Sequence, residues 1–118
     1  MRKTITIGQH EVELLGNAAT AILYKQAFHD DLLKSITELS QDNSGALAMI
    51  EKVEKMAFVM NAQATKSMKE LAGNLTDAAF IDWLAQFDED DFQDAATLTN
   101  ILSVWNKNIK GTSVAKNA

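Results

Sequence analysis

Near its amino terminus the chain carries a run in which apolar and polar residues alternate around a glycine, KTITIGQHEVEL. With Gly8-Gln9 as a two-residue loop, Ile5 lies opposite Val12 on an apolar face, and threonines lie opposite glutamates on a polar face. A shift of register by one residue would put the apolar set in water, so the pattern predicts a β-hairpin over residues 3–14. Because an isolated two-stranded hairpin is marginally stable, its apolar face must pack on other elements.

The residues after the hairpin repeat apolar side chains with the period of an α-helix. A first helix is predicted from Asn17 to Leu39, with Asn17 or Thr20 as its cap, and its apolar stripe consists of Tyr24, Phe28, Leu32, Ile36 and Leu39. A second helix is predicted over residues 46–71, ending near Gly73. Four methionines fall within this second helix, namely Met49, Met56, Met60 and Met68.

Two further helices are predicted in the last third of the chain. A short one over residues 77–87 begins after a cap at Thr76 or Asp77 and carries a bulky aromatic face. The acidic run 88–91 then interrupts the apolar pattern and is expected to cap a final helix over residues 91–110, because negative charge is favourable at a helix amino terminus.

Taken together, these patterns predict a mainly α fold, in which a short N-terminal β-hairpin is followed by a bundle of about four helices. Residues 1–111 are expected to form one domain, and residues 112–118 a disordered tail with little to bury. The length of 118 residues and the 47% hydrophobic content suit a single globular domain.

Charge and composition exclude several classes of function. The formal net charge is −5, and the lysines of the second helix are interspersed with glutamates, which disfavours binding to nucleic acid. No apolar run approaches the roughly 18 residues of a membrane span, so a soluble, cytoplasmic protein without a membrane partner is expected.

Nothing in the sequence builds a catalytic or metal site. The chain has no cysteine and only two histidines, His10 and His29, and its glycines do not form a phosphate-binding loop. The acidic run 88–91 lacks the alternating oxygen ligands, central glycine and terminal glutamate of a calcium loop. We therefore expect no enzyme, no metal and no cofactor.

The hairpin followed by Tyr24-Lys25, Phe28 and Asp30 resembles the amino-terminal pattern of tail assembly chaperones from long-tailed, siphovirus-type bacteriophages. His29 departs from that pattern, because a glycine is common at this position in the family. The resemblance covers about the first third of the chain. It implies a protein that binds the tape-measure protein and keeps it soluble during tail-tube assembly, acting in the host cytoplasm and absent from the mature virion.

The resemblance also suggests where a partner would bind. Methionine and aromatic side chains adapt to many apolar surfaces, although filling a core explains them as well. The candidate partner-binding residues are Tyr24, Phe28, Met56, Met60, Phe80 and Trp83. The tape-measure protein is the expected partner, with the tail-tube protein and a second copy of the chain as further candidates.

Two other functions remain open at the level of sequence. One is a small structural head-to-tail connector that forms rings, and the other is a non-enzymatic helical regulator. In the resembled family, a ribosomal frameshift often makes a longer product, and Ala115-Lys116-Asn117 is compatible with a slippery codon run.

Overall fold

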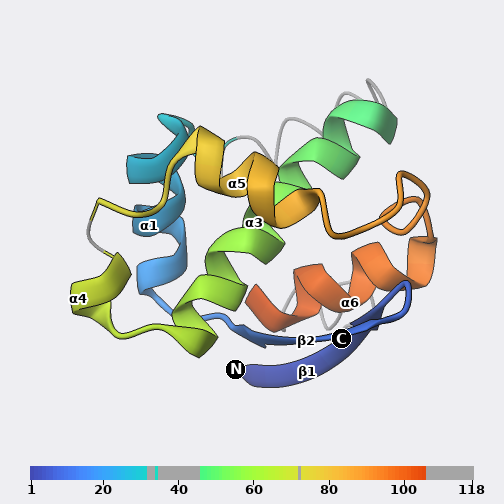
Figure 1. Ribbon diagram of the computed structural model, residues 1–118, viewed down its shortest axis with the longest axis horizontal. Helices are drawn as coiled ribbons and strands as arrows, with labels where there is room; N and C mark the ends of the chain where they lie inside the picture. Colours follow the sequence, from blue (N-terminus) through green and yellow to red (C-terminus); the bar gives the residue numbers. More distant parts are fainter. Residues whose placement is uncertain (32–33, 35–45, 72, 106–118) are drawn as a thin grey trace, which may run out of the picture.

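The computed structural model describes residues 1–31, 34, 46–71 and 73–105. The architecture is mainly α with an N-terminal two-stranded hairpin, as the sequence predicts (Figure 1). The described elements are β1 (Arg2–Ile7), β2 (His10–Leu15), α1 (Ala19–Phe28), α3 (Ala46–Thr65), α4 (Met68–Leu71), α5 (Asp77–Leu84) and α6 (Ala95–Trp105). Helix α3 is central and packs against β2, α1, α5 and α6, while α6 also covers β1 (Figure 1).

The hairpin has the predicted register. Its antiparallel pairs include Ile5 with Val12 and Ile7 with His10, and Gly8 takes the positive φ of 62° that the two-residue turn requires. Each strand is one residue longer at its open end than predicted. The face carrying Ile7 and Leu14, both fully buried, packs on the helices, so the hairpin closes one side of the core.

A second glycine allows the hairpin to approach the last helix. Gly16 follows β2, and a Cβ placed on it would overlap the backbone carbonyl oxygen of Val104 near the end of α6. The Gly16 amide also donates to the carbonyl oxygen of Met1 at 2.8 Å. Only a residue without a side chain fits where the two backbones meet.

The first helix is shorter than predicted. Helix α1 ends at Phe28, because His29 adopts the left-handed conformation with φ 54° and donates its amide to the carbonyl of Lys25 at 2.8 Å. Two residues later, the carboxylate of Asp31 accepts a hydrogen bond from the amide of Lys34 at 3.1 Å, as a helix cap does. The prediction of one continuous helix is therefore wrong at His29. Its continuation over residues 32–33 and 35–39 lies outside the described residues.

The predicted helix over residues 46–71 is divided. Helix α3 ends at Thr65 and α4 begins at Met68, so the expectation of one long helix is wrong. Ser67 and Glu70 form a reciprocal cap: the Ser67 amide donates to the Glu70 carboxylate at 2.9 Å, and the Glu70 amide donates to Ser67 Oγ at 3.2 Å. This capping box starts a new helix where the apolar period alone predicts continuity. Gly73, with φ 78°, follows its end as expected.

The caps of the last two helices differ in how well they were predicted. Thr76 caps α5 as expected, because its Oγ1 accepts from the Ala79 amide at 3.1 Å. The helix ends at Leu84, three residues before the predicted end. Helix α6 begins at Ala95 instead of Asp91, and Asp94 is its cap, accepting from the Thr97 hydroxyl at 3.0 Å. The acidic run 88–91 therefore does not cap this helix, and the predicted segments 106–110 and 112–118 lie outside the described residues.

Candidate functional site

The six predicted partner-binding residues lie in or against the hydrophobic core. Tyr24, Met56 and Met60 have no exposed surface, and Phe80 is 6% exposed. Phe28 and Trp83 are partly buried against the same core. The structure thus brings the six together but leaves them little surface on which a partner can dock.

The aromatic members of this set belong to a continuous cluster of rings. Phe28 packs edge-on against Phe80 with ring centroids 5.5 Å apart, and Phe58 of α3 contacts both of them. Trp83 extends the cluster from Phe58 to Phe87, with centroids 5.8 and 5.0 Å away. These geometries are the tilted and edge-to-face contacts that aromatic rings favour, so the rings serve to hold α1, α3 and α5 together.

Tyr24, Phe28 and Asp30, three residues on which the resemblance rests, lie at or near the end of α1. The buried hydroxyl of Tyr24 donates to the Asp30 carboxylate at 3.4 Å, and Lys52 of α3 forms an ion pair with the same carboxylate. Burial, and next the negative charge of Asp30, raise the pKa of the Tyr24 hydroxyl, which keeps it protonated as a donor. Phe28 completes the arrangement beneath Lys55, whose ammonium group lies 5.1 Å from the ring centroid.

A buried polar network lies between the start of α1 and α3. Thr20 is fully buried, and its hydroxyl donates to Gln63 Oε1 at 2.7 Å, while Gln63 Nε2 donates to Asn17 Oδ1 at 3.0 Å. The Asn17 side chain also accepts from the amide of Ala19 at 2.9 Å. Asn17 or Thr20 was predicted to cap a helix starting at Asn17, but α1 begins at Ala19 after Ala18, which makes no side-chain cap bond. Gln63 was not singled out, because a glutamine amid apolar residues of a helix has no distinctive spacing.

The two histidines have structural positions. His10 lies beside the hairpin turn, where its Nε2 is 3.1 Å from the carbonyl oxygen of Gln86 and its ring meets Phe87 edge-on at 5.1 Å. His29 ends α1 in the left-handed conformation. His10 thus joins the hairpin to the residues that follow α5, and His29 marks the end of α1.

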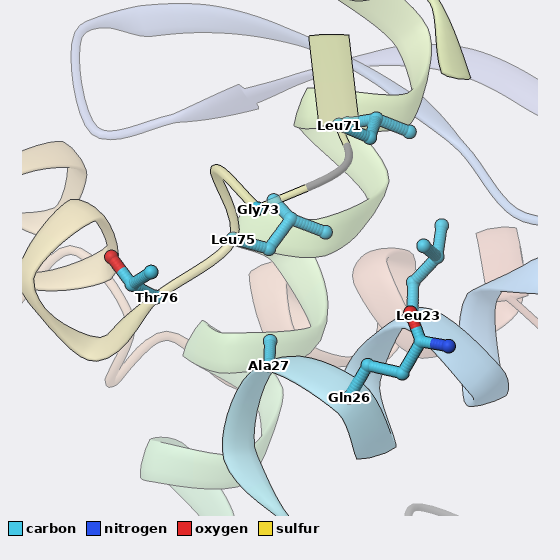
Figure 2. Close-up of a pocket in the computed structure, with 7 residues that line it drawn as sticks. All are labelled: Leu23, Gln26, Ala27, Leu71, Gly73, Leu75 and Thr76. Atoms are coloured by element: carbon cyan, nitrogen blue, oxygen red, sulfur yellow. The ribbon is translucent and has the colours of Figure 1, made fainter. Parts of the chain in front are cut away.

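An apolar groove opens between α1 and the segment that joins α4 to α5 (Figure 2). Leu23 points from α1 toward Leu71 and Leu75 on the opposite wall, and the space between them has a volume of about 240 Å³ (Figure 2). Ala27 and Gln26 continue the α1 wall, and Gly73 and Thr76 complete the other one. The groove has the size and chemistry to receive an aliphatic side chain.

The groove adjoins an exposed apolar side chain that sequence reasoning did not select. Ile22 is 61% exposed and lies one turn before Gln26 on the same side of α1. The other highly exposed isoleucine is Ile81 on α5, at 63%. Helical periodicity places Ile22 on the opposite side of α1 from Tyr24 and Phe28. This position distinguishes Ile22 from the residues of the core.

The acidic run forms a tight turn next to the hairpin. The carboxylate oxygens of Asp88, Asp90 and Asp91 lie within 4.8 Å of one another. Asp91 accepts from the Asp88 amide at 2.9 Å and sits against Gly8, where a Cβ would overlap its carboxyl group. The run thus shapes the loop that leads into α6.

Within the described part of the chain, no helix is long and apolar enough to cross a membrane. No protein-family model, curated protein or solved structure matches the chain.

Proposed function

We propose that the chain is a phage tail assembly chaperone that binds the tape-measure protein and keeps it soluble while the tail tube assembles. The observation that carries the proposal is the dual use of α1. Its end bears Tyr24, Phe28 and Asp30 of the family pattern, and its buried residues Leu23 and Ala27 line the apolar groove. The proposed chaperone acts in the host cytoplasm and leaves before the virion is complete.

The groove supports a binding mode that needs no cofactor and no turnover. A tape-measure protein presents long apolar helices, and a helix docks by inserting apolar side chains into a groove at helical spacing. One such side chain would contact Leu75, which is half-buried, above Leu23 and Leu71, which are only 8% and 2% exposed. The exposed Ile22 would contact the next side chain of the partner helix. Each square ångström of apolar surface buried in this way contributes about 25 cal/mol, so several side chains are needed for firm binding.

The proposal therefore places the contact on the groove instead of on the six residues selected from sequence. Tyr24, Met56 and Met60 are fully buried, so they would not touch the partner. Their substitution would act on folding before it acted on binding.

The test is co-expression with the tape-measure protein encoded by the same genome, scoring soluble recovery of that protein and co-purification of this chain. We expect a soluble complex that forms only when this chain is present. An insoluble tape-measure protein beside well-folded chain would contradict the chaperone proposal. Stable rings of the chain alone would then favour the head-to-tail connector.

A matched pair of variants tests the surface separately from the function. Ile22→Asp puts a charge beside the groove, whereas Ile81→Asp puts the same charge on an equally exposed isoleucine of α5. We expect Ile22→Asp to reduce recovery of the complex at least tenfold and Ile81→Asp to leave it unchanged. If the wild type binds and both variants also bind, the groove is not the contact surface, while the chaperone function stands.

A further inference from the structure

The outer edge of β1 presents backbone hydrogen-bonding groups. In an antiparallel pair, hydrogen-bonded and non-hydrogen-bonded residue pairs alternate. Met1 and Gly16 exchange backbone hydrogen bonds, so the pairs Lys3–Leu14 and Ile5–Val12 are also hydrogen-bonded pairs. The N–H and C=O groups of the intervening residues therefore point away from β2. These residues are Arg2, Thr4 and Thr6.

The two edges of the hairpin differ in how they are covered. On the β2 edge, Asn61 of α3 donates from Nδ2 to the carbonyl oxygen of Glu13 at 2.9 Å. On the β1 edge, no residue that the structure describes makes a hydrogen bond with the outward backbone groups of Thr4 or Thr6, and both threonines are exposed. The strand also lacks a proline that would block further pairing.

Charge changes sign along this open edge. Lys3 is exposed at its beginning, next to Arg2, which is also exposed and forms an ion pair with Glu13 of β2 at 2.6 Å. At the other end, beside Thr6 and Gly8, lies a hollow of about 420 Å³ whose remaining lining residues are Asp90, Asp91, Asp94 and Thr97. An edge that is basic at one end and acidic at the other is complementary to itself when it is turned around by a two-fold axis.

We propose that a second copy of this chain pairs its β1 antiparallel to β1 across a two-fold axis at Thr4, which joins the two hairpins into a four-stranded sheet. In this register Arg2 lies opposite Thr6 of the other copy, and all outward groups of the strand find partners. Lys3 of each copy then lies next to the acidic hollow of the other. The inference does not depend on the proposed function.

The pairing is expected to give a weak, concentration-dependent dimer, because it buries far less surface than an obligate interface. Sedimentation velocity of the full chain over a range of concentrations measures it directly. Ion pairing between the strand ends predicts that added salt weakens the dimer.

Proline substitutions identify the edge. Thr4→Pro removes an outward N–H of β1 and leaves every β1–β2 hydrogen bond intact, so it should raise the dissociation constant of the dimer at least tenfold. Glu11→Pro is the matched control, because it removes an outward N–H from β2, the edge opposite, and should leave the dimer unchanged. Circular dichroism confirms that both variants fold.

A charge exchange tests the two-fold geometry without altering the backbone. Lys3→Glu and Asp90→Lys should each weaken the dimer several-fold, and the double variant should restore it, because the new Glu and Lys again face each other across the axis. These charge variants also test the proposed dimer if the Thr4→Pro variant does not fold.

Several results would overturn the proposal. They are a wild-type chain that stays monomeric at every concentration, a dimer that survives Thr4→Pro, a dimer lost equally in Glu11→Pro, and a double charge variant that does not recover. Loss of a tape-measure complex in Thr4→Pro, with a monomeric wild type, would assign the edge to that partner and overturn pairing between copies.

Discussion

The two sides of α3 are held in different ways. On the side that faces the hairpin, directional hydrogen bonds reach specific backbone atoms, as between Asn61 and the Glu13 carbonyl and between Arg2 and the Ala64 carbonyl at 3.2 Å. On the side that faces α1 and α5, Gln63 and Lys52 of α3 bond to the two ends of α1. Between them, Phe58 meets its neighbours through ring contacts at 5.7 to 6.2 Å. The first side specifies a register and the second mainly fills volume, so we expect the second to tolerate rearrangement better.

Asn61 joins the two sides. Its Nδ2 donates to the hairpin, and its Oδ1 accepts from the indole Nε1 of Trp83 at 3.1 Å. One amide thus ties α3 to β2 and to α5 at once. The predictions that follow separate the contributions of the two sides.

The largest effect is expected for Leu14→Ala, which empties a fully buried position on the hairpin side. A cavity there, together with the lost apolar transfer, should reduce the free energy of unfolding by about 3 kcal/mol. Denaturant unfolding measures this. As a control, Phe28→Leu on the aromatic side keeps most of the volume and should cost about half as much or less. Equal costs would contradict the difference between the sides.

A smaller but still large effect is expected for Asn61→Ala, which removes the link itself. The Glu13 carbonyl and the Trp83 indole would lose their partners, for a cost of about 2 kcal/mol. Thr65→Ala is the control on the same helix. The Thr65 hydroxyl donates to the Asn61 carbonyl at an exposed position, so its loss should cost under about 1 kcal/mol. Similar losses of unfolding free energy for the two variants would show that the Asn61 side chain does not stabilise the packing of α3 on β2 and α5.

Trp83→Phe should cost about 1 kcal/mol, because it removes the indole donor and keeps an aromatic ring. Trp105→Phe is the matched control: Trp105 is also partly buried, and its indole makes no hydrogen bond within the described residues. In a double-mutant cycle, Trp83→Phe should couple to Asn61→Ala and Trp105→Phe should not. If Trp83→Phe and Asn61→Ala show no coupling energy, the hydrogen bond between these residues does not connect the two sides of α3.

The smallest effect concerns Glu54 of α3. Partial burial, and next the charge of Glu51, raise the pKa of Glu54 above its ordinary value. The carboxyl group of Glu54 therefore binds a proton more tightly in the folded state than in the unfolded state. Ionised Glu54 destabilises the fold at a pH above its folded pKa, and this destabilisation is lost as the pH falls below that pKa. Glu54→Gln should stabilise the protein at pH 7 by about a few tenths of a kcal/mol, since solvent screens the charge. The gain should disappear in acid.

Glu70 supplies a control of opposite sign. Its backbone and hydroxyl bonds with Ser67 lower its pKa, so its contribution is present above its ordinary pKa and lost as the pH falls through the lowered value. Glu70→Ala should therefore destabilise the protein at neutral pH and have less effect in acid. Thermal unfolding across pH distinguishes the two variants, and the same sign for both would contradict these assignments.

The sequence allowed the hairpin to be predicted residue by residue, because a period of two permits only one register that buries Ile5, Val12 and Leu14 together. Helix interruptions were not predicted, since apolar periodicity continues across them. One of them had a readable motif: Ser67 followed three residues later by Glu70 is a capping box. The end of α1 at His29 depends instead on contacts of Asp30 with Lys52, which lies on another helix.

The candidate site was harder to predict than the fold. Bulky apolar residues serve both cores and binding surfaces, so composition selected Met56, Met60 and Phe80, which the structure buries. The groove is formed by Leu23 together with residues near 71–76, and this meeting of α1 with a distant loop leaves no local pattern. Ile22 was readable in principle, as an apolar residue outside the buried stripe.

The close contact at Gly16 bears on the order in which this protein folds during synthesis. The hairpin emerges first from the ribosome, but the backbone at Val104 that lies against Gly16 is made about ninety residues later. At a synthesis rate of roughly 5–20 residues per second, the apolar face of the hairpin waits several seconds for part of its cover. During these seconds the exposed apolar face can associate with other chains. We therefore expect the nascent protein to avoid aggregation either by binding a cellular chaperone or by folding rapidly once α6 has been made.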